Sequence, residues 1–504
     1  MVTVLRHFRI VDRDTDIIGS VIIENGFIRE VIPDNADFPD NLLFEKQLER
    51  CVDEAFLLIE GWNLLPEDIS RHSKSPPRYP MLMPAFVDLH AHFRDPGLTE
   101  KETLEAACLA SVAGGYGTVV CMANTLPVTD TPEKAAAVKA RADALDLIDL
   151  YPVLSLSKNM EGRELSGITE LPSGQSENAA GSAMPPSVPP PHCVRMISED
   201  GKDIACDELF IAGMQEARRI GVPVSCHCDA GGQEAEAAKR EGAPRSVWTR
   251  IEENNATLRA IDLGREAGCR LHIAHVSTKE AVEMIRQAKK ELKRNEERGR
   301  NGGKEAGNSA GQERLSERRF SLTCEATPHH IALTGEDARA LGDESHGRVN
   351  PPLRTEDDRR AIFAALRDGT IDAVATDHAP HTQADKEKGA PGFTGLETGF
   401  AVCCSLLLTG RVLTKAEHSI SPSRLSALLS ANPAAILGLC DRGRIAPGLR
   451  ADLTIADSDA VWTVDPARFK SRGKNSPFAG REMRGRVLMT LHGGRVVFEA
   501  ARDT

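Results

Sequence analysis

The chain has 504 residues, 41% of them hydrophobic, and a formal net charge of −12. This length can bury one large core or two to three smaller ones. No apolar run reaches the roughly 18 residues that a membrane span needs, and the N-terminus lacks a secretory signal pattern. The negative charge argues against a nucleic-acid surface, and 12 cysteines in so long a chain do not form a disulfide framework. We expect a cytoplasmic protein that acts on a small molecule, with no membrane or nucleic-acid partner.

The first part of the chain has a strand pattern. Residues 1 to about 35 read as short strands, with Asn25-Gly26 as a hairpin turn. A proline-rich insert follows at 63–80. From residue 81 onward strands alternate with helices, and the predicted strands cover 83–92, 116–123, 149–156, 193–199, 222–228, 270–276, 320–326 and 371–376.

The helices between these strands have start and stop signals. Thr99 with Glu102 predicts a capping box for the first helix, which Gly114-Gly115 ends. Thr131 and Pro132 predict the N-cap and first residue of the next helix. Further helices are predicted at 207–220, within 245–267, at 278–293 and within 355–368.

This alternation predicts the fold class. Eight βα units favour an α/β fold of the (β/α)₈ TIM-barrel type over an open doubly wound sheet. We assign the barrel to 81–440 and expect 1–80 and 441–504 to form a small β-sandwich domain beside it. Inserts at 173–191 and 289–319 are expected to be disordered loops on the barrel face opposite the active site. A helix extension is an equal alternative for the first half of the second insert.

Two histidines end the first barrel strand. His90 and His92 are two residues apart, so in a strand their side chains point to one face and can bind one metal. Arg94 continues the alternation, which suggests metal-assisted chemistry on an anionic substrate. Later strands also end in possible ligands, namely Asp200, His227, His275 and Asp377. Parallel barrel strands bring these ends to one rim, and mixed His and carboxylate ligands suit Zn²⁺, with Mn²⁺ or Co²⁺ as alternatives.

Longer motifs make the chain resemble the dihydroorotases of the amidohydrolase superfamily. These motifs are His90-Ala91-His92 with Arg94-Asp95-Pro96-Gly97, Asn124-Thr125, His275-Val276-Ser277-Thr278, Cys324-Glu325-Ala326-Thr327-Pro328-His329-His330, Val349-Asn350-Pro351-Pro352-Leu353-Arg354 and Asp377-His378-Ala379-Pro380-His381. The tail Gly443-Arg444-Ile445-Ala446-Pro447-Gly448 is typical of the superfamily's β-domain. The two histidines alone identify the superfamily, whereas Arg94, Asn124 and His381 together are more specific.

The resemblance implies a set of metal ligands. A first zinc would be bound by His90, His92, Asp200 and Asp377. A second would be bound by His227 and His275, with Asp200 as the bridge, so that each subunit holds one or two Zn²⁺. Many relatives use a carboxylated lysine as the bridge. Lys202 is the alternative here, but it lies two residues further on.

The resemblance also implies the reaction, which is the reversible cyclisation of N-carbamoyl-L-aspartate to L-dihydroorotate plus water in pyrimidine (UMP) biosynthesis. Asp377 would act as general base and then as acid. Arg94, Asn124 and His381 would bind the substrate carboxylate, for which the arginine fork is suited, and Asn350 would contact the ring amide. We expect a homodimer, and association with aspartate transcarbamoylase is possible because some relatives do this.

Two other functions stay open. A hydantoinase or allantoinase shares the barrel and the paired histidines but generally carries the carboxylated lysine. A degenerate relative could be a non-catalytic scaffold for aspartate transcarbamoylase, although such relatives lose metal ligands and none of the expected ligands is missing here.

For several nearby residues we expect a structural role in place of a catalytic or metal-binding one. Cys226 and Cys228 could be thiolate ligands, but on a strand they point away from the face of His227, so we expect buried, reduced thiols. His329 and His330 are expected to be structural. Three further residues are expected outside the metal-binding set. Glu199 should face away from Asp200, and His378 should point out of the barrel mouth. Asp88 could support the ligands from deeper in the barrel, and structural packing is an equal alternative for it.

Overall fold

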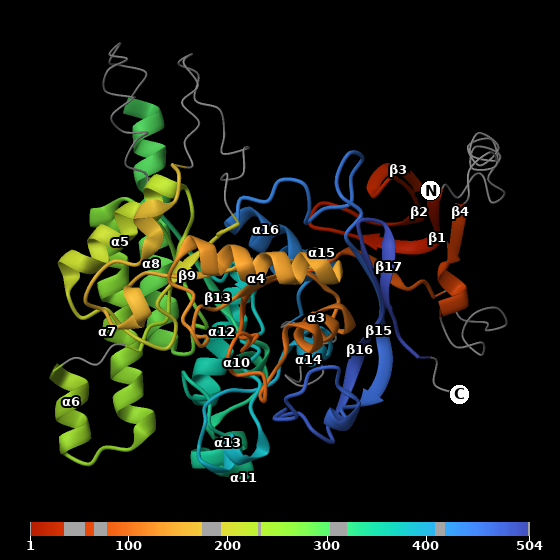
Figure 1. Ribbon diagram of the computed structural model, residues 1–504. Helices are drawn as coiled ribbons and strands as arrows, with labels where there is room; N and C mark the ends of the chain where they lie inside the picture. The colour runs from red at the N-terminus through yellow and green to blue at the C-terminus, as the bar shows by residue number, and fades with distance from the viewer. Residues whose placement is uncertain are drawn as a thin grey trace.

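The computed structural model describes residues 2–34, 56–64, 78–173, 193–229, 233–302, 320–408 and 419–501. A barrel of parallel strands ringed by helices lies beside a separate sheet (Figure 1). Among the described residues, no helix has both the length and the apolar character needed to cross a membrane. Most of each predicted insert, at 65–77, 174–191 and 303–319, lies outside the described residues.

The barrel strands are short and parallel. They are β6 (Phe86–Ala91), β7 (Tyr116–Cys121), β8 (Asp149–Pro152), β9 (Leu154–Ser155), β10 (Ile197–Ser198), β11 (Val224–Cys226), β12 (Arg270–Ile273), β13 (Ser321–Ala326) and β14 (Ala373–Val374). β6 to β8 form one sheet and β9 to β14 another, all paired with their neighbours in parallel. β8 and β9 are halves of one strand that is interrupted at Val153, and a bridge between Ala91 and His378 brings the last strand to the first. The predicted (β/α)₈ barrel is confirmed.

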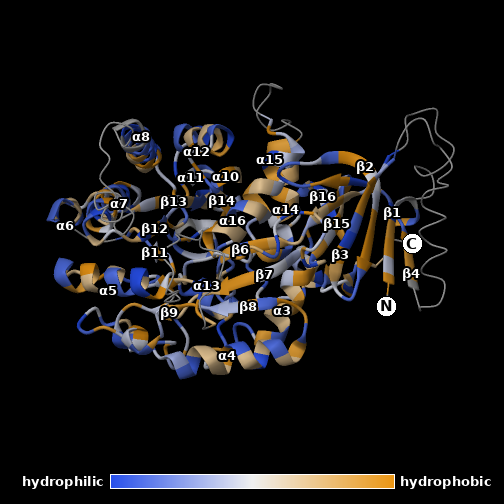
Figure 2. Cartoon of the chain, turned by 90° about the horizontal axis from the view of Figure 1, so that it is seen from above, coloured by the Kyte–Doolittle hydropathy of each residue, from blue (hydrophilic) through white to orange (hydrophobic). Residues whose placement is uncertain are grey.

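Helices surround these strands, as the view from above shows (Figure 2). The longer ones are α3 (Leu104–Ala113), α4 (Pro132–Leu145), α5 (Asp207–Ile220), α6 (Gln233–Arg240), α7 (Arg245–Ala267), α8 (Lys279–Gly302), α12 (Glu356–Asp368) and α14 (Leu396–Cys403). The shorter ones are α10 (Pro328–Ala332), α11 (Gly335–Leu341), α13 (Gln383–Glu387), α15 (Pro422–Ser426) and α16 (Asn432–Ile436). Every residue of β6 and β7 is buried, as expected for parallel strands covered on both faces.

Single helical turns complete the barrel. They are η2 (Lys158–Met160), η3 (Gly167–Glu170), η4 (Gly342–His346), η5 (Cys404–Leu408) and η7 (Ala427–Ala431). The end sheet adds η1 (Gly61–Leu64) and η8 (Pro466–Arg468). Among these, η2 is relevant to the site because its N-cap residue, Ser157, donates its backbone amide to Glu199.

Most predicted helix limits are confirmed, but one cap was wrong. α4 begins at Pro132 after the N-cap Thr131. α3 begins at Leu104 with Thr103 as its N-cap, not Thr99. Glu102 is not available for a capping box, because its carboxylate accepts hydrogen bonds from the hydroxyl of Ser471 and the amide of Arg472. The sequence 289–302, predicted as loop or helix extension, is helix.

The strands of both chain ends lie in one eight-stranded sheet. They are β1 (Val2–Val11), β2 (Asp16–Glu24), β3 (Phe27–Pro33), β4 (Phe56–Glu60), β5 (Met81–Pro84), β15 (Leu453–Thr463), β16 (Glu482–His492) and β17 (Arg495–Glu499). The order is β17-β16-β15-β5-β1-β2-β3, with β4 paired to β1. Figure 1 shows the red N-terminal strands beside the blue C-terminal ones. The description of this part as a β-sandwich, and the domain limits at 80 and 440, stay predictions.

Two local features of this sheet bear on the sequence analysis. Asn25 and Gly26 have positive φ angles of 52° and 86° and connect the antiparallel strands β2 and β3, which confirms the predicted hairpin. β5 pairs with β1 and β15, whereas β6 pairs with β7. The strand predicted over 83–92 is therefore divided at Ala85, and its second half carries the two histidines into the barrel.

Candidate metal centre and substrate site

Five of the predicted metal ligands meet at the carboxyl-terminal rim of the barrel. His90 and His92 lie at the end of β6, and Asp200 follows β10 by two residues. His275 and Asp377 follow β12 and β14. All five side chains are buried.

The ligand atoms of these residues are close together. His90 Nε2 lies 3.1 Å from Asp200 Oδ1 and 3.7 Å from Asp377 Oδ1. His92 Nε2 lies 3.3 Å from Asp377 Oδ1 and 3.6 Å from Asp200 Oδ2. Two groups result, His90–His92–Asp377 and His90–Asp200–His275, each with its ligand atoms within 4.8 Å of one another. Because both groups contain His90 and one imidazole nitrogen binds one metal ion, the two groups describe overlapping positions and not two independent sites.

The residues present fit a divalent metal. Three buried atoms, His90 Nε2, Asp200 Oδ1 and His275 Nε2, form no hydrogen bond with any residue that the structure describes, although the first two lie at ion-pair distance from each other. Burying polar atoms without partners is costly, and a cation at their common centre would remove that cost. Imidazole nitrogens with carboxylate oxygens are a donor set that Zn²⁺ accepts.

The charges in the site also favour a cation. Burial raises the pKa of the Asp200 and Asp377 carboxyl groups, but the imidazoles of His92 and His90 outweigh it and hold both values below the usual range. Burial, with His227 and His90 nearby, holds the pKa of His275 well below its usual value. Asp200 and Asp377 therefore present carboxylates and His275 a neutral imidazole, the protonation states that bind metal. Burial lowers the pKa of His90, but Asp200, Glu325 and Asp377 outweigh it and raise the value, so a metal would displace a proton from His90.

His227 lies next to this centre but belongs to neither group. Its ring centroid is 4.3 Å from that of His275, and its Nδ1 lies 3.2 Å from Asp229 Oδ1. Burial lowers the pKa of His227, but the carboxylates of Asp229 and Asp200 outweigh it and raise the value to about 9. The role of His227 as a ligand of a second metal stays a prediction.

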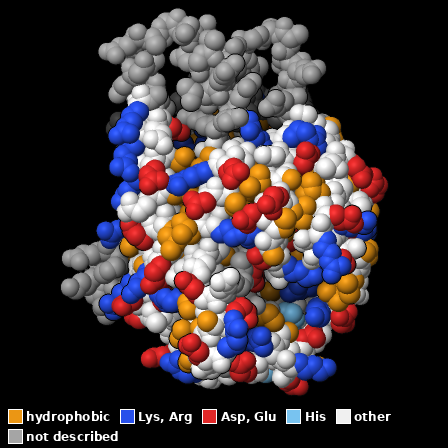
Figure 3. All heavy atoms as spheres, turned by 90° about the vertical axis from the view of Figure 1, so that its left-hand side faces the viewer, with side chains coloured by type: hydrophobic (Ala, Val, Ile, Leu, Met, Phe, Trp, Pro, Cys, Tyr) orange, Lys and Arg blue, Asp and Glu red, His pale blue; other side chains and the backbone are white. Residues whose placement is uncertain are grey.

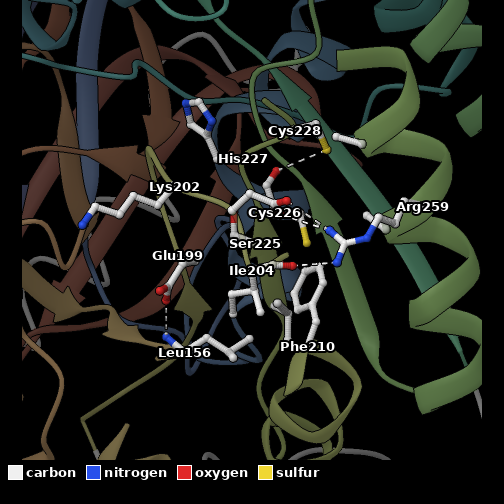
Figure 4. A pocket seen from close by; sticks show the side chains of 14 residues that line it. Leu156, Glu199, Lys202, Ile204, Phe210, Ser225, Cys226, His227, Cys228 and Arg259 are labelled. Carbon is white, nitrogen blue, oxygen red and sulfur yellow. Dashed lines mark hydrogen bonds and ion pairs between the residues drawn. The ribbon is translucent and has the colours of Figure 1, made fainter. Parts of the chain in front are cut away.

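The cysteines beside His227 behave as expected. In Figure 4 the ring of His227 and the sulfur atoms of Cys226 and Cys228 lie on opposite sides of the strand. Both cysteines are free and buried, and burial raises the pKa of Cys228 to about 12. The cavity that they line has a volume of about 20 Å³, which is enough for about one water molecule. These observations support protonated thiols.

Asp200, and not Lys202, lies among the ligand atoms, while its role as a bridge between two metals stays a prediction. Asp200 is buried between His90 and His92, whereas Lys202 is exposed. The loop that carries Asp200 is fastened by Arg259, whose guanidinium donates to the Ile204 carbonyl at 2.6 Å and pairs with Asp203 at 3.1 Å.

Sequence reasoning missed Glu325, a fully buried carboxylate on β13. Its Oε1 lies 3.3 Å from His90 Nδ1, and its Oε2 lies 3.0 Å from His272 Nε2. His272 Nδ1 in turn lies 2.8 Å from Thr323 Oγ1. A carboxylate that accepts from the second nitrogen of a ligand histidine fixes its tautomer and orientation. A charged residue inside an otherwise apolar strand, Cys324-Glu325-Ala326, was the available signal.

The structure brings together two of the three residues expected to bind the carboxylate. Arg94 NH2 lies 3.4 Å from His381 Nε2, and both residues are buried. Asn124 lies instead between two predicted metal ligands. Its Oδ1 lies 3.0 Å from His92 Nδ1, and its Nδ2 donates to Asp200 Oδ2 at 3.0 Å. Asn350 accepts a hydrogen bond from Arg245. The substrate-binding roles of Asn124 and Asn350 stay predictions.

Three residues next to the predicted metal ligands form hydrogen bonds or ion pairs with the backbone or with other side chains. Asp88 accepts from the amides of His90 at 3.2 Å and Thr376 at 2.9 Å, so it joins β6 to β14 below the metal group. The Glu199 carboxylate accepts from the backbone amides of Leu156 and Ser157, just before η2, and belongs to neither ligand group. His378 also avoids the metal group, but the expectation that it points out of the barrel mouth was wrong. It is buried, with Nε2 3.5 Å from Glu102 Oε2.

His329 and His330 lie on α10, directly after β13. His330 has a structural role, since its Nδ1 lies 2.8 Å from Thr327 Oγ1 and its Nε2 lies 3.0 Å from the Pro351 carbonyl. His329 packs edge-on against Phe393, with 5.4 Å between ring centroids. Neither belongs to the metal-ligand groups found among the described residues.

A (β/α)₈ barrel with histidines and aspartates at its carboxyl-terminal rim is the architecture of metal-dependent hydrolases. The family model described as amidohydrolase family matches residues 81–497. The chain belongs to this family, whose members are generally metal-dependent.

Among curated proteins, the chain is similar to dihydroorotases. It is 36% identical over 419 residues to that of Clostridium botulinum (strain Eklund 17B / Type B), covering 83% of this chain and 88% of the relative. It is 37% identical over 431 residues to that of Anaeromyxobacter dehalogenans (strain 2CP-C), covering 83% and 86%.

Solved structures agree on the fold. The L-hydantoinase of Arthrobacter aurescens superposes with a TM-score of 0.73 at 22% identity, covering 99% of this chain and 96% of that one. The dihydropyrimidinase of Brevibacillus agri NCHU1002 gives 0.70 at 18% identity, covering 99% and 95%. At these identities the likeness concerns the fold alone.

Proposed function

We propose that the protein is a dihydroorotase, which opens the ring of L-dihydroorotate by hydrolysis and closes N-carbamoyl-L-aspartate in the reverse direction. The single observation that carries this proposal is the buried Arg94 guanidinium, 3.4 Å from His381 and beside the metal group. A buried cation at this place suits a substrate that carries a carboxylate next to the reacting ring. The similarity to curated dihydroorotases supports the same substrate.

The metal would be Zn²⁺, held by His90, His92, Asp200 and Asp377, with His275 and His227 available for a second ion. When bound, such a cation polarises a carbonyl oxygen and makes water nucleophilic near neutral pH. Asp200 approaches His90 with Oδ1 and His92 with Oδ2, and it shares a ligand group with His275, which supports it as the bridging ligand. Glu325 and Asn124 would hold His90 and His92 in orientation through their Nδ1 atoms.

The catalytic proton transfer would be carried out by Asp377. Its carboxylate accepts the proton of the attacking water as the ring carbonyl carbon gains an oxygen. The carbon–nitrogen bond then breaks, and Asp377 returns the proton to the leaving nitrogen. Arg94 and His381 hold the substrate carboxylate throughout, and Asn350 contacts the ring amide. In the biosynthetic direction the same steps run in reverse and release water.

The test is a dihydroorotate hydrolysis assay with metal analysis on the wild type and Asp377→Ala. Loss of the acid–base group should lower kcat by at least about 10³-fold. Asp262→Ala is the matched control, because this α7 side chain is 60% exposed and lies outside the site. Retention of wild-type kcat in Asp377→Ala would reject the mechanism.

A hydantoinase is the second candidate, because it would share the barrel and the paired histidines His90 and His92. Hydantoin has no carboxylate, so it would leave the buried Arg94 guanidinium without a substrate group to bind. Faster turnover of hydantoin than of dihydroorotate would favour this candidate. The homodimer and an association with aspartate transcarbamoylase stay predictions, and size-exclusion chromatography with light scattering tests both.

A further inference from the structure

A pocket of about 360 Å³ lies beside His381, outside the metal group. Four cationic residues line it, Lys101, Lys386, Arg472 and Lys474, against a single carboxylate, Glu100. This excess of positive charge is local to the pocket. On the face shown in Figure 3, Lys and Arg side chains are interspersed with Asp and Glu, and the whole chain has a net charge of −12.

The four cations differ in how far they are already engaged. Lys386 is buried and donates to the carbonyls of Arg348, Ala390 and Gly392. Lys474 is exposed and donates to two carbonyls at 2.8 Å, and Lys101 Nζ lies 3.7 Å from Asp385 Oδ2.

Arg472 differs from the other three. It is exposed, and its guanidinium forms no hydrogen bond or ion pair within the described parts of the chain. The five N–H donors of its guanidinium are therefore available to a ligand. Arg472 is therefore the cation of the pocket most able to contact an incoming anion.

The segment that carries Arg472 is held firmly against the barrel rim. The backbone amide of Arg472 donates to buried Glu102 at 3.1 Å, and that of Ser471 donates to Glu397 at 3.0 Å. Asn475 accepts from the amide of His381 at 3.1 Å and donates to the carbonyl of Ala379 at 3.0 Å. The positive charges are thus presented at a fixed place next to the substrate residues.

The pocket ends at a side chain with an unpaired buried atom. His381 is only 8% exposed, and its Nδ1 has no hydrogen-bond partner among the described residues. Its Nε2 lies 2.9 Å from the Pro391 carbonyl and 3.4 Å from Arg94 NH2. One ring therefore lines the basic pocket on one side and touches the buried guanidinium on the other.

We propose that this pocket is an entry site for a carboxylate of the open-chain substrate, which it attracts before Arg94 and His381 receive it. The inference rests on the proposed dihydroorotase function. N-carbamoyl-L-aspartate carries two carboxylates and dihydroorotate carries one, so the pocket favours the biosynthetic substrate. Clefts of one charge sign raise the local concentration of an oppositely charged substrate and its association rate.

The test changes the charge of Arg472 and measures both reaction directions in the holoenzyme. At low salt, Arg472→Glu should lower kcat/KM for N-carbamoyl-L-aspartate about fivefold, through a higher KM. For dihydroorotate the loss should be about twofold, because the electrostatic free energy scales with substrate charge. Arg472→Gln should show smaller losses in the same order, and Arg472→Lys should stay near wild type. In about 0.5 M KCl the losses should largely vanish.

Arg294→Glu is the matched control, because this exposed residue of α8 undergoes the same charge change away from the pocket. Equal losses in Arg472→Glu and Arg294→Glu, equal losses for the two substrates, or losses that persist in high salt would overturn the entry site. A wild-type enzyme inactive on both substrates would instead reject the proposed function. If Arg472→Glu does not fold, Arg472→Gln decides the outcome.

Discussion

Replacing Glu325 by Gln should weaken metal binding while leaving the shape of the core unchanged. The carboxylate serves two imidazoles at once, His90 at 3.3 Å and His272 at 3.0 Å. Glutamine has one acceptor oxygen and one NH₂ group, so at least one of these contacts loses its acceptor. Contacts of this kind hold a ligand histidine in the tautomer and orientation that bind metal.

The expected loss of metal affinity follows from those two contacts. Removing a partner that supports a ligand histidine lowers metal affinity about 10- to 100-fold, which is about 1.4 to 2.8 kcal/mol. Competition with a chromophoric chelator measures the affinity, and circular dichroism checks the fold. Glu336→Gln on α11, where the side chain is 88% exposed, is the control. Zinc affinity in Glu325→Gln equal to that of the wild type would refute the positioning role.

Two further predictions concern binding and stability. Arg94→Lys should raise KM for dihydroorotate about tenfold with less effect on kcat, because a point charge cannot replace the fork; an unchanged KM would contradict this. Asp358 pairs with Arg250 at 2.6 Å, and although burial opposes it, this pairing helps to lower the pKa of Asp358 to about 2. The stabilising contribution of the ionised Asp358 carboxylate is present above about pH 4 and is lost as the pH falls toward about 2. Asp358→Asn should destabilise by roughly 3 kcal/mol at pH 7 in urea titrations, whereas an unchanged midpoint would show that the pair contributes nothing.

Local patterns predicted much of the fold and the centre of the site. The spacing of His90 and His92 sets their common face within one strand, and Gly221 ends α5 in a left-handed conformation with φ 81°. Such features depend on neighbours in sequence. The barrel then brings each strand end to the same rim, which is why Asp377 could be placed beside the histidines without knowing any distance.

The features that sequence analysis missed depend on long-range contacts. Glu325 is 235 positions from His90, so nothing near either residue reveals their contact. The predicted cap at Thr99 failed because Glu102 is recruited by Ser471 and Arg472, about 370 positions later. The substrate-binding role that the resemblance gives Asn124 stays a prediction, but the contacts of its amide with His92 and Asp200 depend on the folded rim and could not be read from the sequence.

The pairing of β5 with β15 has a consequence for how the chain matures. Pro84 lies opposite Leu453, and β5 leads within two residues into β6, the strand that carries His90 and His92. At a ribosomal speed of about 5–20 residues per second, roughly 20 to 70 s separate the synthesis of these partners. β5, which precedes the first barrel strand, therefore completes its pairing only near the end of translation, when β15 has been made. A nascent chain should acquire full metal affinity only after β15 has left the ribosome.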